Sequence, residues 1–238
     1  MKPIYKNSAW APYAKVSQQF FTDTVISTSE LAVGCFGISR KDYQTGVVLT
    51  TSAMAVSLTL GFNRGHVYEL FRGVATSSWI NKVKTDTSFR FADVAADSPN
   101  PILVPKKIIQ NEYLTAQEKV VIICLHNSST LKLKSMKGWA AAARMHPRTL
   151  TKSIKELKKI NVLKDWPGRK FPMLNEPNAW RMMDRTSHKE AYAHEWKRLG
   201  YEITTPTAPA TQPAPVLSIV PMSIYSDTED GFIQWQIA

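Results

Sequence analysis

The pattern of hydrophobic and polar positions is most regular in the middle of the chain, where it predicts a well-capped helix. Thr115 is followed three residues later by Glu118, the spacing of a capping box in which each side chain binds a free backbone amide at the helix start. Leu114, just before this pair, suits the hydrophobic staple that accompanies such a cap. Residues 119–125 then continue with apolar side chains nearly all round, as in a buried helix, and the polar residues 126–129 end it.

Two more helices are predicted beyond this one, separated by a proline. The alanines within residues 132–145 have the highest helix propensity, and their small side chains allow another helix to approach closely. Pro147 disfavours helical backbone at the residue before it, so we expect this helix to end there and another to begin near Arg148. In that last helix, apolar residues recur at helical spacing and form one stripe: Leu150, Ile154 and Leu157.

The remaining faces of the last helix carry positive charges and hydroxyl groups, on Arg148, Thr149, Lys152, Ser153, Lys155, Lys158 and Lys159. After the helix, residues 161–166 have the composition of a strand, and residues 169–174 supply a return strand. The Pro-Gly pair between them is a turn signal. The pattern therefore predicts two helices joined by a tight turn and followed at once by a basic hairpin.

In this order of elements, residues 114–174 resemble the winged helix-turn-helix superfamily, especially the versions found in bacterial, phage and plasmid regulators and replication proteins. The resemblance covers roughly a quarter of the 238 residues and indicates an architecture rather than one protein. It implies a module that binds double-stranded DNA, with the second helix of the pair in the major groove. The segments that carry it are Thr115–Leu125, Trp139–Arg144, Arg148–Leu157 and Val162–Leu163.

The resemblance also implies roles for the basic residues. Base-edge contacts are expected near the start of the recognition helix, from Arg148, Thr149, Lys152 and Ser153. Phosphate contacts are expected from Lys155, Lys158, Lys159, Lys137 and Arg144. At the wing, Arg169 and Lys170 are expected to hold the DNA backbone or enter the minor groove, whereas Trp139 and Leu150 are expected in the core. The alternative for the whole basic face is a solvated helix surface.

The first hundred residues predict a mostly helical domain. Two segments, Ser29–Lys41 and Met54–Phe71, each have the pattern of a helix, a glycine-containing turn and a second helix. In the later segment Asn63, Arg64 and His66 would begin the second helix, which makes this segment a candidate for a second DNA-binding unit. The alternative is a helical dimerisation domain, and a homodimer would suit a palindromic DNA site.

Changes in composition predict further divisions of the chain. We expect an N-terminal domain over residues 1–100, the DNA-binding domain over 101–183 and a helical extension over 184–200, with its helix from Ser187 to Leu199. Residues 201–216 are a linker of Pro, Ala and Thr that favours extended conformations. Residues 217–238 form an acidic, aromatic tail, which either docks a protein partner or folds back as a strand.

Charge supports a polyanionic partner. The 238 residues include 30 Lys and Arg against 19 Asp and Glu, a formal net charge of +11, and 44% are hydrophobic, enough to bury a core. Such an excess of positive charge lets a surface neutralise phosphates and release their counterions. The alternative is a basic protein that is merely soluble.

Other classes of function have little support in the sequence. Only Cys35 and Cys124 are present, without metal-ligand spacing, and His188 and His194 do not share a helical face, so we expect no metal, cofactor or disulfide. Glycine-rich phosphate loops and common catalytic motifs are missing, and the chain is expected not to be an enzyme. Neither a signal peptide nor an apolar run long enough for a membrane span is seen, so the expected location is the cytoplasm, with the nucleoid.

The expected fold is therefore mainly α with a small β wing: a winged helix-turn-helix, an N-terminal helical domain and a tethered C-terminal tail. The expected function is that of a site-specific protein for double-stranded DNA, a transcriptional regulator of a bacterium or its mobile elements. One alternative is a plasmid or phage replication initiator that binds origin repeats. Another is an interaction protein that holds nucleic acid without sequence preference.

Overall fold

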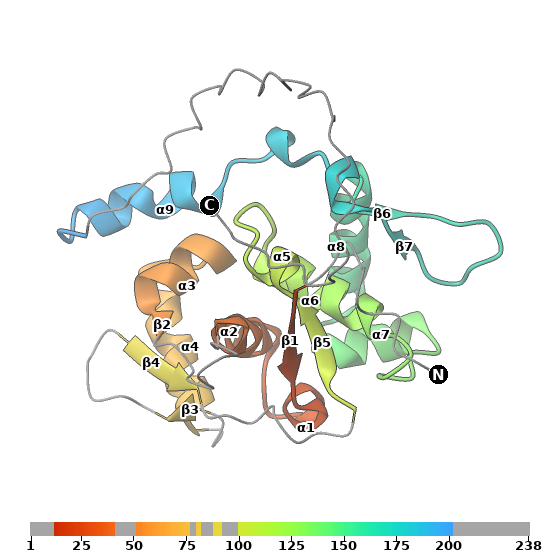
Figure 1. Cartoon of the computed structure of the whole chain (residues 1–238), viewed down its shortest axis with the longest axis horizontal. Helices are drawn as coiled ribbons and strands as arrows, with labels where there is room; N and C mark the ends of the chain where they lie inside the picture. Colours follow the sequence, from red (N-terminus) through yellow and green to blue (C-terminus); the bar gives the residue numbers. More distant parts are fainter. Residues whose placement is uncertain (1–11, 41–50, 77–79, 82–87, 92–99, 202–238) are drawn as a thin grey trace, which may run out of the picture. The chain divides into compact units, whose positions relative to one another are not determined.

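A computed structural model describes residues 12–40, 51–76, 80–81, 88–91 and 100–201 of the chain (Figure 1). The chain divides into two compact units, Met1–Ile203 and Thr204–Ala238. The second unit lies wholly outside the described residues, and so do the predicted tail and nearly all of the predicted linker. The following paragraphs concern the first unit.

The described residues are mainly helical, as the sequence predicts, and they include small antiparallel sheets, of which the sequence predicts only the one in residues 161–174. The helices are α1 (Gln18–Thr22), α2 (Thr28–Ser39), α3 (Ala53–Leu60), α4 (Arg64–Thr76), α5 (Lys106–Ile109), α6 (Ala116–His126), α7 (Met136–Ala142), α8 (Pro147–Lys159) and α9 (His188–Lys197), with 3-10 turns at Pro177–Ala179 and Met182–Asp184. The strands are β1 (Tyr13–Val16), β2 (Thr51–Ser52), β3 (Ile80–Asn81), β4 (Ser88–Phe91), β5 (Ile102–Pro105), β6 (Leu163–Lys164) and β7 (Met173–Leu174). They pair as β1-β5, β2-β4-β3 and β6-β7, all antiparallel.

The segments on the two sides of residue 100 share one core. Strand β1 pairs with β5 so that Ala14 lies opposite Val104, and both residues are fully buried. Helix α2 packs against α6, which brings the buried Cys35 and Cys124 into this core. Burial raises the pKa of the Cys35 thiol to about 12, so the thiol stays protonated and unreactive. The described segments before and after residue 100 therefore share one hydrophobic interior.

Capping boxes start helices α2, α6 and α9. Helix α6 begins as predicted: the Thr115 side chain accepts a hydrogen bond from the Glu118 amide at 3.3 Å, and the Glu118 carboxylate accepts one from the Thr115 amide at 2.9 Å. The same reciprocal pair, Ser187 with Glu190, starts α9, which lies within the predicted span Ser187–Leu199. These caps satisfy amides that have no partner inside the helix.

The predicted helix-turn-helix in Ser29–Lys41 is wrong. Helix α2 runs without a break from Thr28 to Ser39, through Gly34 and Gly37. A side chain at Gly34 would collide with the Phe20 ring, so this glycine allows α1 to pack closely on α2 and is not a turn residue. Burial of nearly the whole helix outweighs the low helix propensity of its glycines.

The later segment forms the predicted pair of helices. Helix α3 ends at Leu60, Gly61 takes a φ of 75°, which favours glycine, and α4 begins at Arg64. Asn63 caps α4, since its side-chain oxygen accepts a hydrogen bond from the His66 amide at 2.9 Å. Strands β3 and β4 follow, and β2, just before α3, pairs with β4. The expected mostly helical N-terminal segment thus also contains a short sheet.

Helix α9 is packed against α3 (Figure 1). The Trp196 side chain is 1% exposed, and its indole N–H donates to the Ser57 hydroxyl at 3.0 Å. At the other end of α9, the His188 amide donates to the Glu112 carbonyl at 2.9 Å. The predicted helical extension is therefore part of the main unit, because its tryptophan fills the core between distant segments.

Candidate nucleic-acid interface

A sharp break separates α7 from α8, as Pro147 predicts. Arg144, after the end of α7, has a φ of 56°, and α8 begins at Pro147. Proline suits the first helical position because it has no amide proton that needs a partner there. His146 is the N-cap residue, and its Nδ1 accepts a hydrogen bond from the Arg148 amide at 3.2 Å. The two helices are therefore joined by a short turn with its own cap.

Helix α7 is shorter than predicted. The alanine-rich pattern indicated a helix over residues 132–145, whereas α7 spans Met136–Ala142. Ser135 starts it, because its hydroxyl accepts a hydrogen bond from the Gly138 amide at 3.0 Å. Lys132 has a φ of 51°, a left-handed conformation that no α-helix includes. Lys137, an expected phosphate contact, lies on this helix and is exposed.

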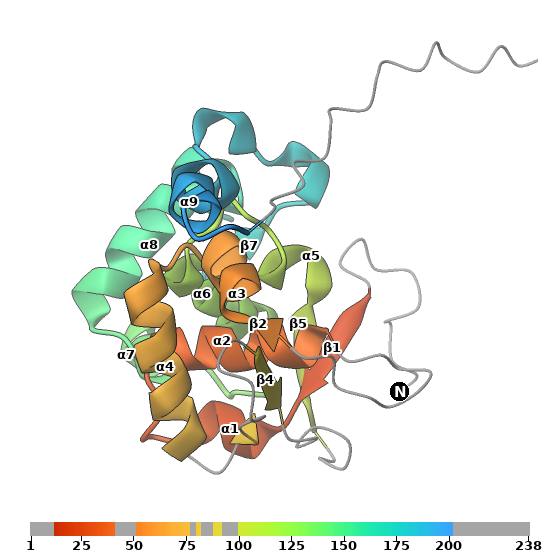
Figure 2. The same cartoon turned by 90° about the vertical axis from the view of Figure 1, so that its left-hand side faces the viewer.

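Helix α8 buries one side and exposes the other. The predicted apolar stripe is confirmed, with exposed fractions of 0% for Leu150, 8% for Ile154 and 0% for Leu157. The opposite side carries exposed cations at intervals of four, three and four residues, which places them on one face: Arg148, Lys152, Lys155 and Lys159. We call these four residues the basic row. In Figure 2, α8 lies along one edge of the described elements.

Ion pairs divide the cations of α8 into two groups. The Lys158 ammonium lies 2.7 Å from the Asp165 carboxylate, and the Lys159 ammonium lies 2.8 Å from the Glu156 carboxylate. The hydrogen bond from Lys159 lowers the pKa of Glu156, which keeps this carboxylate charged. Within the described part of the chain, no ion pair engages Arg148, Lys152 or Lys155. Among the cations of α8, these three are therefore the most available to an external anion.

Ser153 does not belong to the exposed face. Only 7% of Ser153 is exposed, so the buried side chain is not placed to make the expected contact with a DNA base. The reason is helical spacing: residue 153 follows Leu150 by three and precedes Leu157 by four, and both of these face the core. Thr149, by contrast, is half-buried beside the basic row.

Arg144 connects the turn between α7 and α8 to the N-terminal segment by hydrogen bonds. Its guanidinium donates to the carbonyl of Phe21 at 3.2 Å and to that of Ala141 at 3.1 Å. The Thr28 hydroxyl binds the carbonyls of Ala143 and Arg144 at 2.8 and 2.7 Å. Because the guanidinium is already bonded within the chain, the expected phosphate contact from Arg144 is not favoured.

The predicted hairpin follows α8, with shorter strands than expected. Strand β6 pairs with β7, and Leu163 lies opposite Leu174. A tight turn lies at the predicted Pro-Gly pair: Gly168 has a φ of 75°, and the Arg169 amide donates to the Trp166 carbonyl at 3.0 Å. Arg169 and Lys170 are exposed in the loop. The Lys170 ammonium donates to the Lys134 carbonyl at 2.6 Å, which fixes this part of the loop against the segment before α7.

The candidate residues of the earlier helix pair lie at the start of α4. Asn63 is exposed and caps the helix, whereas Arg64 and His66 are half-buried. The Arg64 guanidinium lies over the Tyr68 ring at 5.5 Å, and the His66 ring lies 5.1 Å from that of Phe62. Val67 is fully buried and Leu70 is 7% exposed, so this side of α4 faces the core. Each helix pair follows a buried helix and precedes two antiparallel strands; in the earlier pair, strand β2 also lies between the buried helix and α3 and joins the sheet.

A buried ion pair lies at the start of α6, and the sequence analysis did not predict it. The Glu118 carboxylate accepts two hydrogen bonds from the Arg185 guanidinium, at 2.7 and 2.8 Å. The hydrogen bonds that Arg185 donates to Glu118 raise the pKa of Arg185. The next residue, Lys119, is fully buried; its ammonium group donates to the Thr59 carbonyl at 2.6 Å, and burial holds its pKa well below the usual value. The capping box pointed to Glu118, but nothing local points to a partner 67 residues away.

None of the described helices combines the length and the hydrophobicity that a bilayer span requires. Comparison of the chain with protein-family models, with curated protein sequences and with solved structures finds no match.

Proposed function

We propose that this protein binds double-stranded DNA at specific sites, as a transcriptional regulator of a bacterium or its mobile elements. In this proposal α6, α7, α8 and the β6-β7 hairpin form a winged helix-turn-helix, with α8 as the recognition helix. The observation that carries it is the basic row, which lies opposite the buried stripe of α8, the second helix of a tightly joined pair. That is the geometry in which a helix can enter the major groove while its other side stays packed.

The exposed side chains suit different parts of a duplex. Arg148, Thr149 and Lys152 lie at the start of α8, where base edges are reached, and arginine can bind guanine with two hydrogen bonds. Lys155 lies one turn later and suits a phosphate. Arg169 in the hairpin loop and Lys137 on α7 suit the DNA backbone on either side. The net charge of +11 adds a sequence-independent attraction to the same partner.

A second candidate function is that of a plasmid or phage replication initiator. The observation that favours it is the second helix pair, α3 and α4, with its own hairpin in the same compact unit. In Figure 2, α4 and α8 lie along the same edge of the described elements. A single chain with two different recognition helices suits an asymmetric site, such as the repeats of an origin, whereas a symmetric dimer suits a palindrome. Asn63 and Arg64 are the side chains by which α4 would contact such a site.

The experiment that tests the proposal is selection of random duplex DNA on the purified full-length protein, with affinities measured at two salt concentrations. We expect a recovered motif that is bound far more tightly than random duplex at both salt concentrations. An asymmetric motif would favour one chain with two contact units, and an inverted repeat would favour a homodimer. Recovery of no motif, with a steep loss of affinity in salt, would leave only a non-specific nucleic-acid-holding protein.

Single substitutions in α8 should separate base contacts from phosphate contacts. We expect Arg148→Ala to cost about 1–3 kcal/mol on the selected site and to relax its sequence preference. We expect Lys155→Ala to weaken binding to all duplexes alike and to lower the slope of affinity against salt by about one unit. Lys158→Ala should weaken DNA binding less than Lys155→Ala does, because the Lys158 ammonium is already paired with Asp165.

Fluorescence anisotropy on specific and random duplexes over a salt series measures all three variants. Lys197→Ala is the charge-matched control, because Lys197 is exposed and belongs to α9, a helix that lies apart from α8 in Figure 1. Equal losses for Arg148→Ala on the two kinds of duplex would mean that α8 is not the element that reads the sequence.

A further inference from the structure

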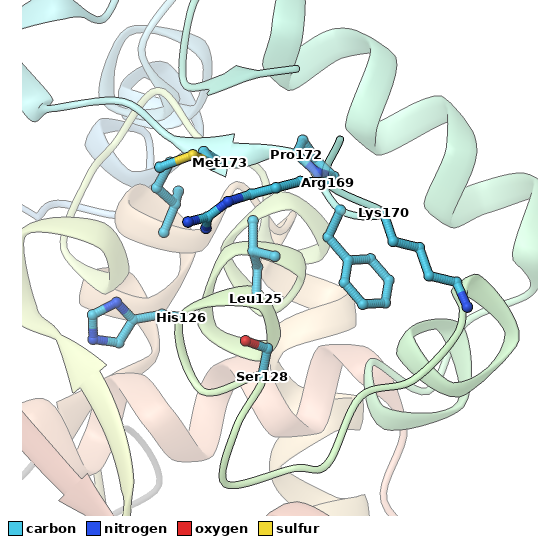
Figure 3. A pocket seen from close by; sticks show the side chains of 9 residues that line it. Leu125, His126, Ser128, Arg169, Lys170, Pro172 and Met173 are labelled. Carbon is cyan, nitrogen blue, oxygen red and sulfur yellow. The ribbon is translucent and has the colours of Figure 1, made fainter. Parts of the chain in front are cut away.

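A pocket of about 450 Å³ lies between the end of α6 and the loop that leads into β7 (Figure 3). Volumes of roughly 300–1,000 Å³ are typical of small-molecule sites. The pocket is lined on one side by Leu125, His126 and Ser128 and on the other by residues 169–174. It thus joins the first helix of the proposed DNA-binding module to its hairpin.

The lining combines apolar walls with a single guanidinium above them. Leu125 and Met173 supply apolar surface, and Phe171 adds an aromatic ring. Figure 3 shows the Arg169 side chain reaching across the pocket above Leu125, while Lys170 points away from it. No carboxylate is among the lining residues. Such a pocket attracts an anion and resists a cation.

Several lining groups are held in place by contacts outside the pocket. The Phe171 ring meets the buried Trp139 edge to face, with centroids 5.7 Å apart. The His126 ring is stacked on Tyr13 of β1, with centroids 5.4 Å apart. The Lys170 ammonium is bonded to the Lys134 carbonyl at 2.6 Å, which accounts for its direction away from the pocket. The walls are therefore preformed, and Arg169 is the cation that can turn toward a ligand.

We propose that this pocket binds a small organic monocarboxylate with an aromatic or aliphatic body. The apolar part would lie against Leu125, Phe171 and Met173, and the carboxylate would pair with the Arg169 guanidinium, whose planar fork fits two carboxylate oxygens. Ser128 supplies a hydroxyl within the same lining. Burial lowers the pKa of His126, so its ring is neutral at pH 7 and adds no second positive charge. One guanidinium matches one carboxylate.

Occupancy has a consequence for DNA, and this step rests on the proposed function. Arg169 is one of the residues assigned to the DNA backbone, and a carboxylate bound in the pocket would compete for its guanidinium. The ligand would therefore weaken DNA binding, and DNA would weaken ligand binding by the same factor. The pocket makes the carboxylate an effector of the DNA-binding protein.

The first arm of the test uses the full-length protein without DNA. Benzoate, 2-naphthoate and octanoate are titrated by calorimetry or ligand-observed NMR, with 2-naphthylmethanol as the neutral analogue. At least one carboxylate should bind, and 2-naphthoate should bind roughly tenfold more tightly than the alcohol, since a charge-assisted hydrogen bond distinguishes them. Arg169→Gln should remove this preference, and the control Arg148→Gln, in another exposed arginine, should retain it.

Two results would overturn the pocket assignment: no binding of any of the three carboxylates at millimolar concentration, or equal binding of 2-naphthoate to the wild type and Arg169→Gln. The second arm adds 2-naphthoate to the complex of the protein with duplex DNA. The affinity for the DNA should then fall roughly fivefold. Arg169-dependent ligand binding by a protein that binds no DNA would retain the pocket and reject the proposed function. A protein that binds DNA but none of the carboxylates would retain the proposed function and reject the pocket assignment.

Discussion

Replacing Glu118 with Gln should lower the free energy of unfolding by about 3 kcal/mol or more, because it removes the negative partner of a buried ion pair and leaves the positive one. The Glu118 side chain is 5% exposed and that of Arg185 is 19% exposed. Gln can still accept the hydrogen bond from the Thr115 amide, so the capping box survives. Its amide group then faces the guanidinium as a second donor, so the Arg185 charge loses its carboxylate partner and keeps only neutral acceptors, such as the Tyr113 carbonyl at 3.2 Å.

Urea unfolding followed by circular dichroism measures this loss. The matched control is Glu156→Gln, which breaks the exposed pair with Lys159 and should change stability far less than Glu118→Gln does, because solvent screens an exposed pair. In the double variant Glu118→Gln/Arg185→Met the unpaired charge is gone, so the loss should be smaller than the sum of the two single losses. Equal effects of Glu118→Gln and Glu156→Gln would show that burial adds nothing to the pair.

Replacing Trp139 with Ala should cost about 3–5 kcal/mol, the range for removing a large aromatic side chain from a core. Trp139 is fully buried, and its indole N–H donates to the Val121 carbonyl at 3.2 Å. Its ring also meets Phe171 of the hairpin loop. The substitution therefore leaves a cavity among α6, α7 and the hairpin, and the hairpin loses the contact that holds its loop.

Trp139→Phe is the control, because it keeps an aromatic ring and removes the N–H donor; its cost should be about 1–2 kcal/mol. Hydrogen exchange adds a local readout. The Asn175 amide donates to the Val162 carbonyl at 2.9 Å, and its protection should fall in Trp139→Ala more than in Trp139→Phe. A loss of stability below about 1 kcal/mol would contradict the central place of this tryptophan in the core.

Local signals in the sequence predicted much of the second half of the fold. The capping box at Thr115, the break at Pro147 and the apolar stripe of α8 are all present, and each depends on residues within one or two helical turns. The turn at Gly168 is also present, because a Pro-Gly pair favours this geometry almost regardless of its surroundings. Where the sequence pattern failed, as for Gly34 in α2 and for the start of α7 at Met136, a close contact or a cap outweighed intrinsic propensity.

The sequence by itself determined the helical character of the chain, the start of its best-capped helices and the positive charge that α8 presents. Tertiary structure alone decided which cations stay available: Asp165 engages Lys158, the Phe21 carbonyl engages Arg144, and the core takes Ser153. It also decided the pairing of Glu118 with Arg185 and the joining of the two halves through β1 and β5. The physical reason is range: propensities and caps act between neighbours in sequence, whereas burial and charge pairing depend on which distant segments the folded core brings together.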